Sequence, residues 1–139
     1  MANPSLAAVA AGKDKKHVVL MIEDDLFWLK LYGDQFTRAG FEVVLASTGP
    51  EGVHQAILKH PDVILLDLML PQKSGFEVLV DLRSNDAAKD IPVIILSILG
   101  QESDIAEAMR LGAQDYLLKT DVRVSDVIAK VKEWLNKSR

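Results

Sequence analysis

The chain has no cysteine, few basic residues and no long apolar run. Without cysteine, disulfide bonds, thiolate nucleophiles and zinc–thiolate sites are excluded. The 16 lysines and arginines are outnumbered by 20 acidic residues, and the net charge of −4 argues against a nucleic-acid surface on this domain. Every apolar run falls short of the ~20 residues needed to cross a bilayer, so we expect a soluble, cytoplasmic protein without a membrane partner.

The composition suits one globular domain that follows a short leader. Hydrophobic residues make up 49% of the 139 residues and the mean hydropathy is +0.13, which is enough for a buried core. Residues 1–15 are rich in alanine and lack the basic start of a signal peptide, so we expect a disordered leader there. The folded domain is expected over residues 16–139.

After the leader, short apolar runs alternate with longer amphipathic segments. This alternation is typical of strand–helix units around a parallel sheet, and runs with successive apolar residues suit strands covered on both faces. Strands are expected at 17–22, 41–46, 62–67, 92–97 and 115–119, and helices at about 25–39, from Thr48, 74–84, 102–111 and 124–137. The expected fold class is α/β, a flavodoxin-like doubly wound (βα)5 fold with strand order 2-1-3-4-5.

Local patterns support the helix positions. Thr48 and Ser74 are each followed three residues later by a glutamate, which is the capping-box pattern of a helix start. The helix over 25–39 is expected to bury a face made by residues at helical spacing, namely Trp28, Leu31, Tyr32, Gln35, Phe36 and Ala39.

Polar residues lie at the carboxyl ends of four of the five expected strands. They are Glu23 and Asp24, Asp67, Ser97 and Lys119. Because the carboxyl ends of parallel strands lie along one edge of a sheet, these side chains can form one site. Three neighbouring carboxylates repel each other unless a cation binds, and oxygen ligands suit Mg²⁺. The histidines lie away from strand ends, which argues against zinc, and we interpret them as surface or structural residues: His17, His54 and His60.

Asp67 is the best candidate for a residue that reacts. It ends the central strand, and an aspartate can attack phosphorus to form an acyl phosphate while a metal ion neutralises the phosphoryl oxygens. Ser97 could donate a hydrogen bond to one phosphoryl oxygen, and Lys119 could bring a positive charge to another. The pattern therefore predicts a phosphoryl-accepting site.

Residues 17–137 resemble the receiver domain of two-component response regulators, the family of chemotaxis and sporulation phosphorelay regulators. The resemblance rests on VVLMIEDD, PDVILLDLMLPQKSGFEVL, IPVIILS and GAQDYLLKT. It implies that Asp67 is the phosphoacceptor, that Asp24 binds Mg²⁺ directly and that Glu23 binds it through water. Met69 would offer its backbone carbonyl to the metal.

The resemblance also implies a signalling function rather than an enzymatic one. The domain would take a phosphoryl group from a histidine kinase or histidine phosphotransfer protein, and would itself catalyse only its own phosphorylation and dephosphorylation. Ser97 would be the switch hydroxyl, Lys119 the phosphoryl contact and Tyr116 the switch aromatic. Partner binding would then change through the face formed by residues 102–111, 115–119 and 124–137.

Two positions depart from the family pattern, and one acidic residue has another role. Thr120 stands where proline usually follows the lysine, so we expect a trans peptide there. Ile98 stands where a small residue is more usual and is expected to obstruct access to the phosphoryl group. We interpret Asp25 as a partner of the helix dipole rather than a metal ligand.

Other functions compatible with this fold class are a receiver-like interaction module that is not phosphorylated and a haloacid-dehalogenase-like phosphatase. The phosphatase family needs a second aspartate two residues after the first, and Met69 occupies that position. The sequence gives even less support to an FMN-binding or nucleotide-binding function, because Glu23, Asp24 and Asp25 would repel phosphate.

Overall fold

The computed structural model describes residues 15–137, so most of the expected leader lies outside the described residues. The described part alternates strands and helices, as the apolar pattern predicts. The strands are β1 (Val18–Ile22), β2 (Glu42–Ala46), β3 (Val63–Leu66), β4 (Val93–Ser97) and β5 (Asp115–Leu118). The helices are α2 (Leu26–Arg38), α3 (Gly49–Lys59), α4 (Gly75–Ser84), α5 (Glu102–Arg110) and α6 (Val124–Lys137).

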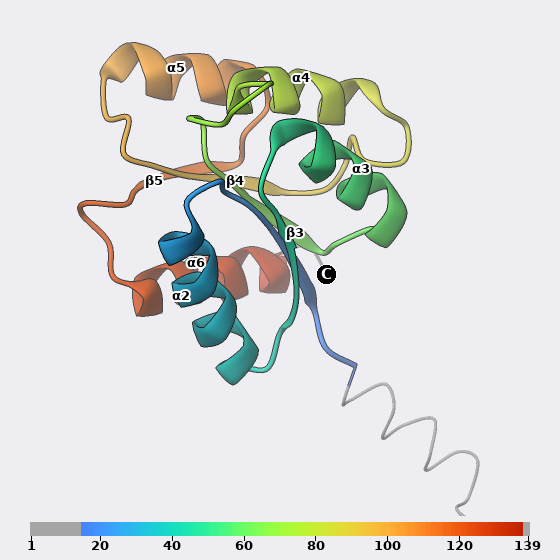
Figure 1. Cartoon of the computed structure of the whole chain (residues 1–139), viewed down its shortest axis with the longest axis vertical. Helices are drawn as coiled ribbons and strands as arrows, with labels where there is room; N and C mark the ends of the chain where they lie inside the picture. Colours follow the sequence, from blue (N-terminus) through green and yellow to red (C-terminus); the bar gives the residue numbers. More distant parts are fainter. Residues whose placement is uncertain (1–14, 138–139) are drawn as a thin grey trace, which may run out of the picture.

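The strands form one parallel sheet with the order β2-β1-β3-β4-β5, which confirms the predicted topology. Figure 1 shows the sheet as a middle layer, with α3, α4 and α5 on one face and α2 and α6 on the other. The direction of winding reverses between β1 and β3, and a crevice opens beyond the carboxyl ends of strands at such a point.

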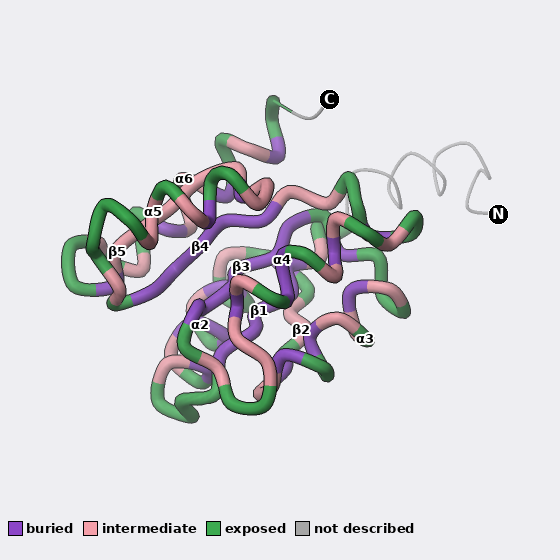
Figure 2. The backbone as a smooth tube through the Cα atoms, turned by 90° about the horizontal axis from the view of Figure 1, so that it is seen from above, coloured by how far each residue is buried: buried purple, intermediate pink, exposed green. Residues whose placement is uncertain are grey.

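The three inner strands are the most deeply buried part of the molecule. Every residue of β3 and β4 is buried, and in the tube view β1, β3 and β4 run through the centre (Figure 2). One core cluster packs this sheet against α3, α4 and α5, and a second packs it against α2 and α6. Burial on both faces explains why the strand sequences are apolar at successive positions.

The helix starts agree with the local patterns, apart from one detail. The side-chain oxygens of Thr48 and Ser74 accept hydrogen bonds from the backbone N–H of Glu51 and Glu77, respectively. In return, the Glu51 carboxylate accepts a hydrogen bond from the N–H of Ser47 and not from that of Thr48. The cap is therefore displaced by one residue from the usual reciprocal pair.

The buried face of α2 is rotated slightly from the one that the spacing predicts. Its buried residues are Leu29, Tyr32, Gly33 and Phe36. Trp28, Leu31, Gln35 and Ala39 are only partly buried. The shift follows from packing, since Leu29 joins the cluster beneath the sheet while Trp28 lies at the edge of that cluster.

Arg83 connects the end of α4 with two loops at the amino end of β4 and β5. Its guanidinium donates to the carbonyls of Gly112, Lys89 and Ile91 and to the side-chain oxygen of Gln114. Gln114 also accepts a hydrogen bond from the N–H of Val93. One arginine thus satisfies carbonyls that no strand or helix pairs.

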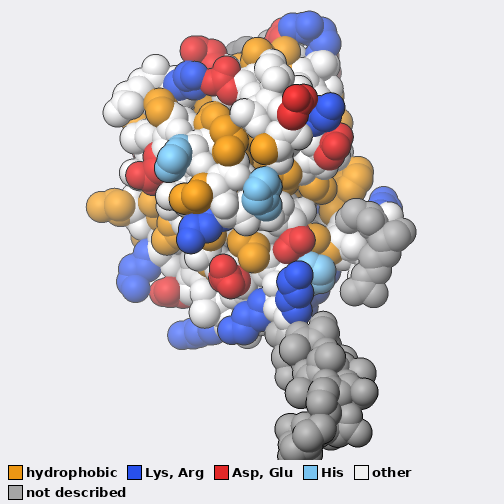
Figure 3. Space-filling view, turned by 90° about the vertical axis from the view of Figure 1, so that its right-hand side faces the viewer, with side chains coloured by type: hydrophobic (Ala, Val, Ile, Leu, Met, Phe, Trp, Pro, Cys, Tyr) orange, Lys and Arg blue, Asp and Glu red, His pale blue; other side chains and the backbone are white. Residues whose placement is uncertain are grey.

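The histidines lie at the surface, as expected. His17, His54 and His60 are all exposed, and the face in Figure 3 shows histidine side chains among interspersed acidic, basic and apolar ones. His17 pairs with Asp62 at 3.7 Å, and His60 ends α3 in the left-handed conformation. Within residues 15–137, no helix is both long enough and apolar enough to cross a membrane.

Candidate metal and phosphoacceptor site

Strand register brings two of the predicted carboxylates side by side. Ile22 and Leu66 are paired in neighbouring parallel strands, so Glu23 and Asp67, the next residue of each chain segment, leave the sheet at the same edge. The N–H of Asp67 donates to the carbonyl of Ile22 at 3.0 Å and continues the ladder by one bond. The side chains of Glu23 and Asp67 are both buried.

Asp24 completes a cluster of three acids. One carboxylate oxygen from each of Glu23, Asp24 and Asp67 lies within 4.8 Å of the others. They line a cavity of about 250 Å³ together with Lys119, Trp28, Asp25, Met69 and Ile98. Asp24 is exposed at the mouth, whereas Glu23 and Asp67 form the floor.

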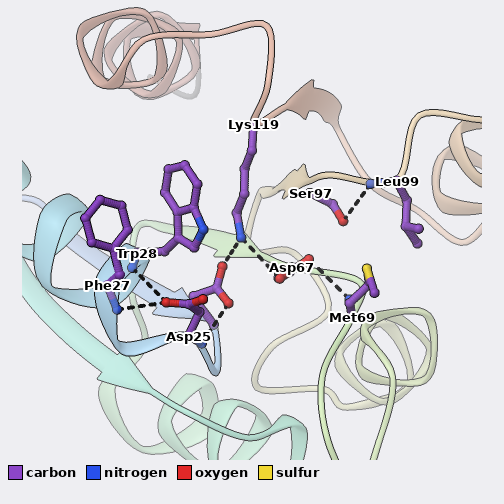
Figure 4. Close-up of polar contacts among 9 residues, drawn as sticks. Asp25, Phe27, Trp28, Asp67, Met69, Ser97, Leu99 and Lys119 are labelled. Carbon is purple, nitrogen blue, oxygen red and sulfur yellow. Dashed lines mark hydrogen bonds and ion pairs between the residues drawn. The ribbon is translucent and has the colours of Figure 1, made fainter.

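Lys119 reaches into the cluster from the other half of the sheet. Its N–H bonds the Ser97 carbonyl at 3.0 Å, which fixes the start of the side chain beside β4. Its ammonium contacts a carboxylate oxygen of Glu23 and lies 3.2 Å from Oδ2 of Asp67 (Figure 4). With only 3% of its side chain exposed, Lys119 is a buried cation that needs these partners.

Burial is the largest influence on Glu23. It raises the pKa of the carboxyl from 4.5 to about 7, and the charge of Asp67 adds to the rise. The hydrogen bonds from Lys119 and from the N–H of Asp25 lower the pKa and only partly compensate. Without a metal ion, Glu23 therefore holds its proton more tightly than an exposed glutamate does.

Asp25 caps a helix, in agreement with its predicted role. Its Oδ1 accepts hydrogen bonds from the N–H groups of Phe27 and Trp28, at 2.8 and 3.4 Å. These are free amides of the first turn of α2, so the carboxylate is held at the positive end of the helix. Asp25 lines the cavity but is not part of the cluster of three acids.

Ser97 and Tyr116 are joined through the backbone of Leu99. The Ser97 hydroxyl oxygen accepts from the Leu99 N–H at 3.3 Å, and the Tyr116 hydroxyl donates to the Leu99 carbonyl at 2.5 Å. Burial, together with the charges of Asp104 and Asp67, raises the pKa of Tyr116 to about 12, so the phenol stays a donor. Ser97 is not among the residues that line the acidic cavity, and Figure 4 shows its hydroxyl directed toward Leu99.

Ile98 and Met69 form part of the wall at the mouth of the cavity. They are 55% and 49% exposed, which is high for large apolar side chains. Ile98 therefore stands at the rim, where the sequence predicts an obstruction, and it is not a core residue. No peptide bond in residues 15–137 is cis, so the bond between Lys119 and Thr120 is trans, as expected.

Gly75 lets α4 approach the strand that carries Asp67. Its N–H bonds the carbonyl of Leu68 at 3.0 Å, and a Cβ at this position would collide with the backbone of Asp67 and Leu68. Glycine is needed here because helix and loop are in close contact.

Trp28 is the member of the site that motif reasoning did not assign. Its ring lies 5.0 Å from the Lys119 ammonium, a cation–π distance, and the ring lines the cavity. One signal was available in the sequence, since Trp28 follows Asp24 by four residues, about one helical turn. What the spacing could not indicate is that a lysine 91 positions later would lie against this ring.

The donor set fits a small, hard cation. Three carboxylates converge, and the residues that line the cavity include no histidine or cysteine, the ligands that zinc prefers. The carboxylate charge is partly balanced by Lys119, so a divalent ion would share Glu23 and Asp67 with the ammonium. Mg²⁺, which keeps several waters, suits a site that is open on one side.

Comparison with known proteins identifies the family model that matches this chain. The model described as the response regulator receiver domain matches residues 19–132. The DNA-binding dual master transcriptional regulator RpaA of a Synechocystis strain is 38% identical over 120 residues, which are 86% of this chain and 49% of RpaA. The chain spans about half the length of the curated relatives that it matches.

Solved structures agree with the sequence match. The receiver domain of the Francisella response regulator 1452 aligns with a TM-score of 0.82 and 27% identity, covering 89% of this chain and all 100% of that one. The receiver domain of the Pseudomonas aeruginosa histidine kinase PA1611, solved with a coordinated magnesium ion, aligns with a TM-score of 0.80 over 87% of this chain and 98% of its own. At 22% identity, that second likeness establishes the shared fold alone.

Proposed function

This chain belongs to the family of response regulator receiver domains, and from that premise we propose that Asp67 is its phosphoacceptor. The observation that carries the proposal is the placement of the Asp67 carboxylate between a cluster of acids and a buried ammonium. The ammonium and a bound cation would together balance the charge of a phosphoryl group at this position.

In the proposed reaction, a carboxylate oxygen of Asp67 bonds to phosphorus as the phosphorus–nitrogen bond of a phosphohistidine breaks. The electron pair of that bond leaves with the imidazole of the donor. When bound, Mg²⁺ supplies positive charge to the phosphoryl oxygens. Asp24 and Asp67 would hold the ion directly, Glu23 through water and Met69 through its backbone carbonyl, whereas Lys119 would bind a phosphoryl oxygen.

Ser97, Leu99 and Tyr116 are proposed to convert the chemistry into a change of surface. The Ser97 hydroxyl would donate to a phosphoryl oxygen, and the rotation that brings it there would take its oxygen away from the Leu99 N–H. If Ser97 turns toward the phosphoryl group, the backbone that holds the Tyr116 hydroxyl is released on one side. The face built by α5, β5 and α6 then repacks, and its affinity for a downstream protein changes.

The proposed partners are a histidine kinase or histidine phosphotransfer protein as donor and a downstream protein as target. RpaA is described as a DNA-binding transcriptional regulator, and this chain aligns with about half of it. DNA contact by the domain itself is not part of the proposal, because the net charge is −4. We also propose a cytoplasmic location and no catalysis beyond self-phosphorylation and self-dephosphorylation.

The test is phosphorylation of Asp67→Asn. Incubation of the wild-type chain with acetyl phosphate and Mg²⁺ should give an adduct that is stable in acid and labile in base, with one phosphoryl group per chain. Asp67→Asn should give none, and omission of Mg²⁺ from the wild-type reaction should reduce labelling strongly. Full labelling of Asp67→Asn would overturn the assignment.

A matched control comes from the opposite end of the same strand. Asp62 precedes β3 and accepts a hydrogen bond from the N–H of Val18, far from the acidic cavity. Asp62→Asn should label like the wild type. A wild-type chain that is folded, binds Mg²⁺ and is never labelled would instead favour the interaction module that is not phosphorylated.

A further inference from the structure

We propose that Trp28 is a positioning residue for Lys119, and that its indole ring holds the ammonium in place while the carboxylates around it change partners. The proposal rests on the proposed function of Asp67. Its evidence is the contact between the ring and the ammonium, at 5.0 Å from the ring centre.

The contacts of the Lys119 ammonium do not all survive the reaction. In the structure it is bound to Glu23 and Asp67. A divalent ion would draw on the charge of Glu23, and phosphorylation would consume an oxygen of Asp67. Among the described contacts of this ammonium, the Trp28 ring is the one that neither binds the ion nor carries the phosphoryl group.

The backbone of Lys119 alone cannot fix the position of its ammonium. The residue follows β5, an edge strand whose residues are all only half-buried, and the hydrogen bond to Ser97 holds the main chain and not the ammonium. Four methylene groups separate the backbone from the charge. A flat apolar surface beside the charge restricts these rotations, keeps water from the ammonium and attracts the cation electrostatically.

Trp28 is itself held on several sides. Its ring packs edge-on against Phe27, with centroids 5.5 Å apart. It also contacts the ring of Tyr32, and those two centroids are 6.0 Å apart. Tyr32 is buried and stacks on Phe36, which places the column on the core beneath the sheet. The Trp28 backbone is fixed by the Asp25 cap. The ring is therefore a rigid support for a flexible side chain.

The chain contains a second pair of the same kind, and this pair provides a control. The Lys137 ammonium lies 5.1 Å from the centre of the Trp134 ring on α6, away from the acidic cavity. The same substitution can therefore be made at a tryptophan that contacts a lysine inside the site and at one outside it.

The experiment measures the rate of phosphorylation by acetyl phosphate at saturating Mg²⁺ in Trp28→Leu, Trp28→Phe and Trp134→Leu. Trp28→Leu keeps an apolar side chain and loses the ring face, so phosphorylation should slow by about threefold to tenfold. Trp28→Phe should recover much of the rate, and Trp134→Leu should match the wild type. Urea unfolding of each variant shows whether all of them remain folded.

A spectroscopic measurement tests the contact without any phosphoryl transfer. In Trp134→Phe the remaining tryptophan emission comes from Trp28, and Lys119→Met should change its intensity, whereas Lys119→Arg should largely retain it. Equal phosphorylation rates for folded Trp28→Leu and wild type would overturn the proposal. A faster rate in Trp28→Leu would overturn it too, because the ring would then obstruct access to the site. Absence of labelling in the wild type would refute the function of Asp67 instead, so the two failures are distinguishable.

Discussion

The hydroxyl of Tyr116 donates a hydrogen bond of 2.5 Å to the carbonyl of Leu99, whose own N–H is bound by the hydroxyl of Ser97. One peptide segment after β4 is thus held from both sides by the two side chains that the family resemblance assigns to switching. A change at either side chain alters the restraint on the same residue.

This relationship predicts faster exchange of the Leu99 amide when a phosphoryl mimic is bound. With Mg²⁺ and beryllofluoride, the Ser97 hydroxyl should turn to the mimic and release the Leu99 N–H. Loss of one such hydrogen bond should speed exchange by about twofold to tenfold. The measurement is hydrogen exchange by NMR, with the amide of Phe41, bonded to the Phe36 carbonyl at the end of α2, as an internal reference. Unchanged exchange of Leu99 would argue against coupling through this residue.

The sequence is sufficient to predict the sheet because its inner strands are buried on both faces. In a small α/β domain, a run such as VIILS suits only a strand that is covered on both faces. The reactive or ligating side chains at four strand ends indicate which edge of the sheet carries the site. The cluster of Glu23, Asp24 and Asp67 followed directly from strand order.

Side-chain contacts between distant segments could not be predicted in this way. The bond from Tyr116 to the Leu99 carbonyl depends on how a loop turns, and the contact between Trp28 and Lys119 depends on the rotation of α2. The spacing alone does not give the rotation of α2 either, because it gives a period but does not choose between adjacent faces.

Stability of the metal-free protein should fall as the pH rises from 5 to 8. Burial raises the Glu23 pKa from 4.5 to about 7, so the folded state binds a proton that the unfolded state has lost in this interval. The stabilisation is complete below pH 4.5 and disappears above about 7, a loss of about 2 to 3 kcal/mol. Urea unfolding at several pH values measures it.

Two comparisons isolate the contribution of Glu23. Glu23→Gln cannot titrate, so its stability should change less with pH than that of the wild type. Saturating Mg²⁺ should also flatten the profile, since the ion competes with the proton for the same carboxylates. A Glu23→Gln profile that parallels the wild type would assign the pH dependence to other groups.

Ile98→Ala should accelerate both charging by acetyl phosphate and loss of the phosphoryl group. The side chain lines the mouth of the cavity, and an attacking water or a small donor must approach Asp67 in line with the breaking bond. Because Ile98 is 55% exposed, truncation should cost less than about 1 kcal/mol of stability. Phosphoryl half-life and urea midpoint are measured on the same variant.

Val80→Ala is the matched control for Ile98→Ala. Val80 is also β-branched and is 46% exposed, but it lies on α4 away from the cavity. Its variant should keep the wild-type rates. Rates that do not change in Ile98→Ala would show that the isoleucine is not a steric gate.

Arg83→Met should destabilise the fold by about 2 to 4 kcal/mol. The substitution leaves the part-buried carbonyls of Gly112 and Ile91 and the side-chain oxygen of Gln114 without their charged donor, and acceptors that lose a partner away from water are costly. Arg110→Met is the control, since Arg110 is exposed and pairs with Glu107 one turn earlier on α5. Thermal and urea unfolding measure both. A loss below about 0.5 kcal/mol in Arg83→Met would show that water replaces the arginine.

Because Gly75 has no side chain, one side of the site is packed more tightly than the other. On one side, α4 lies so close to the backbone of Asp67 that the helix and Asp67 form a fixed frame, and Gly52 packs α3 equally closely on Ile22. On the other side, the residue before α5 is Gln101, and its side chain makes no capping hydrogen bond to the helix. We therefore expect sequence variation to differ between the two sides of the site. Residues of α5 and its preceding loop can vary with the identity of the partner, while the chemistry at Asp67 keeps its geometry.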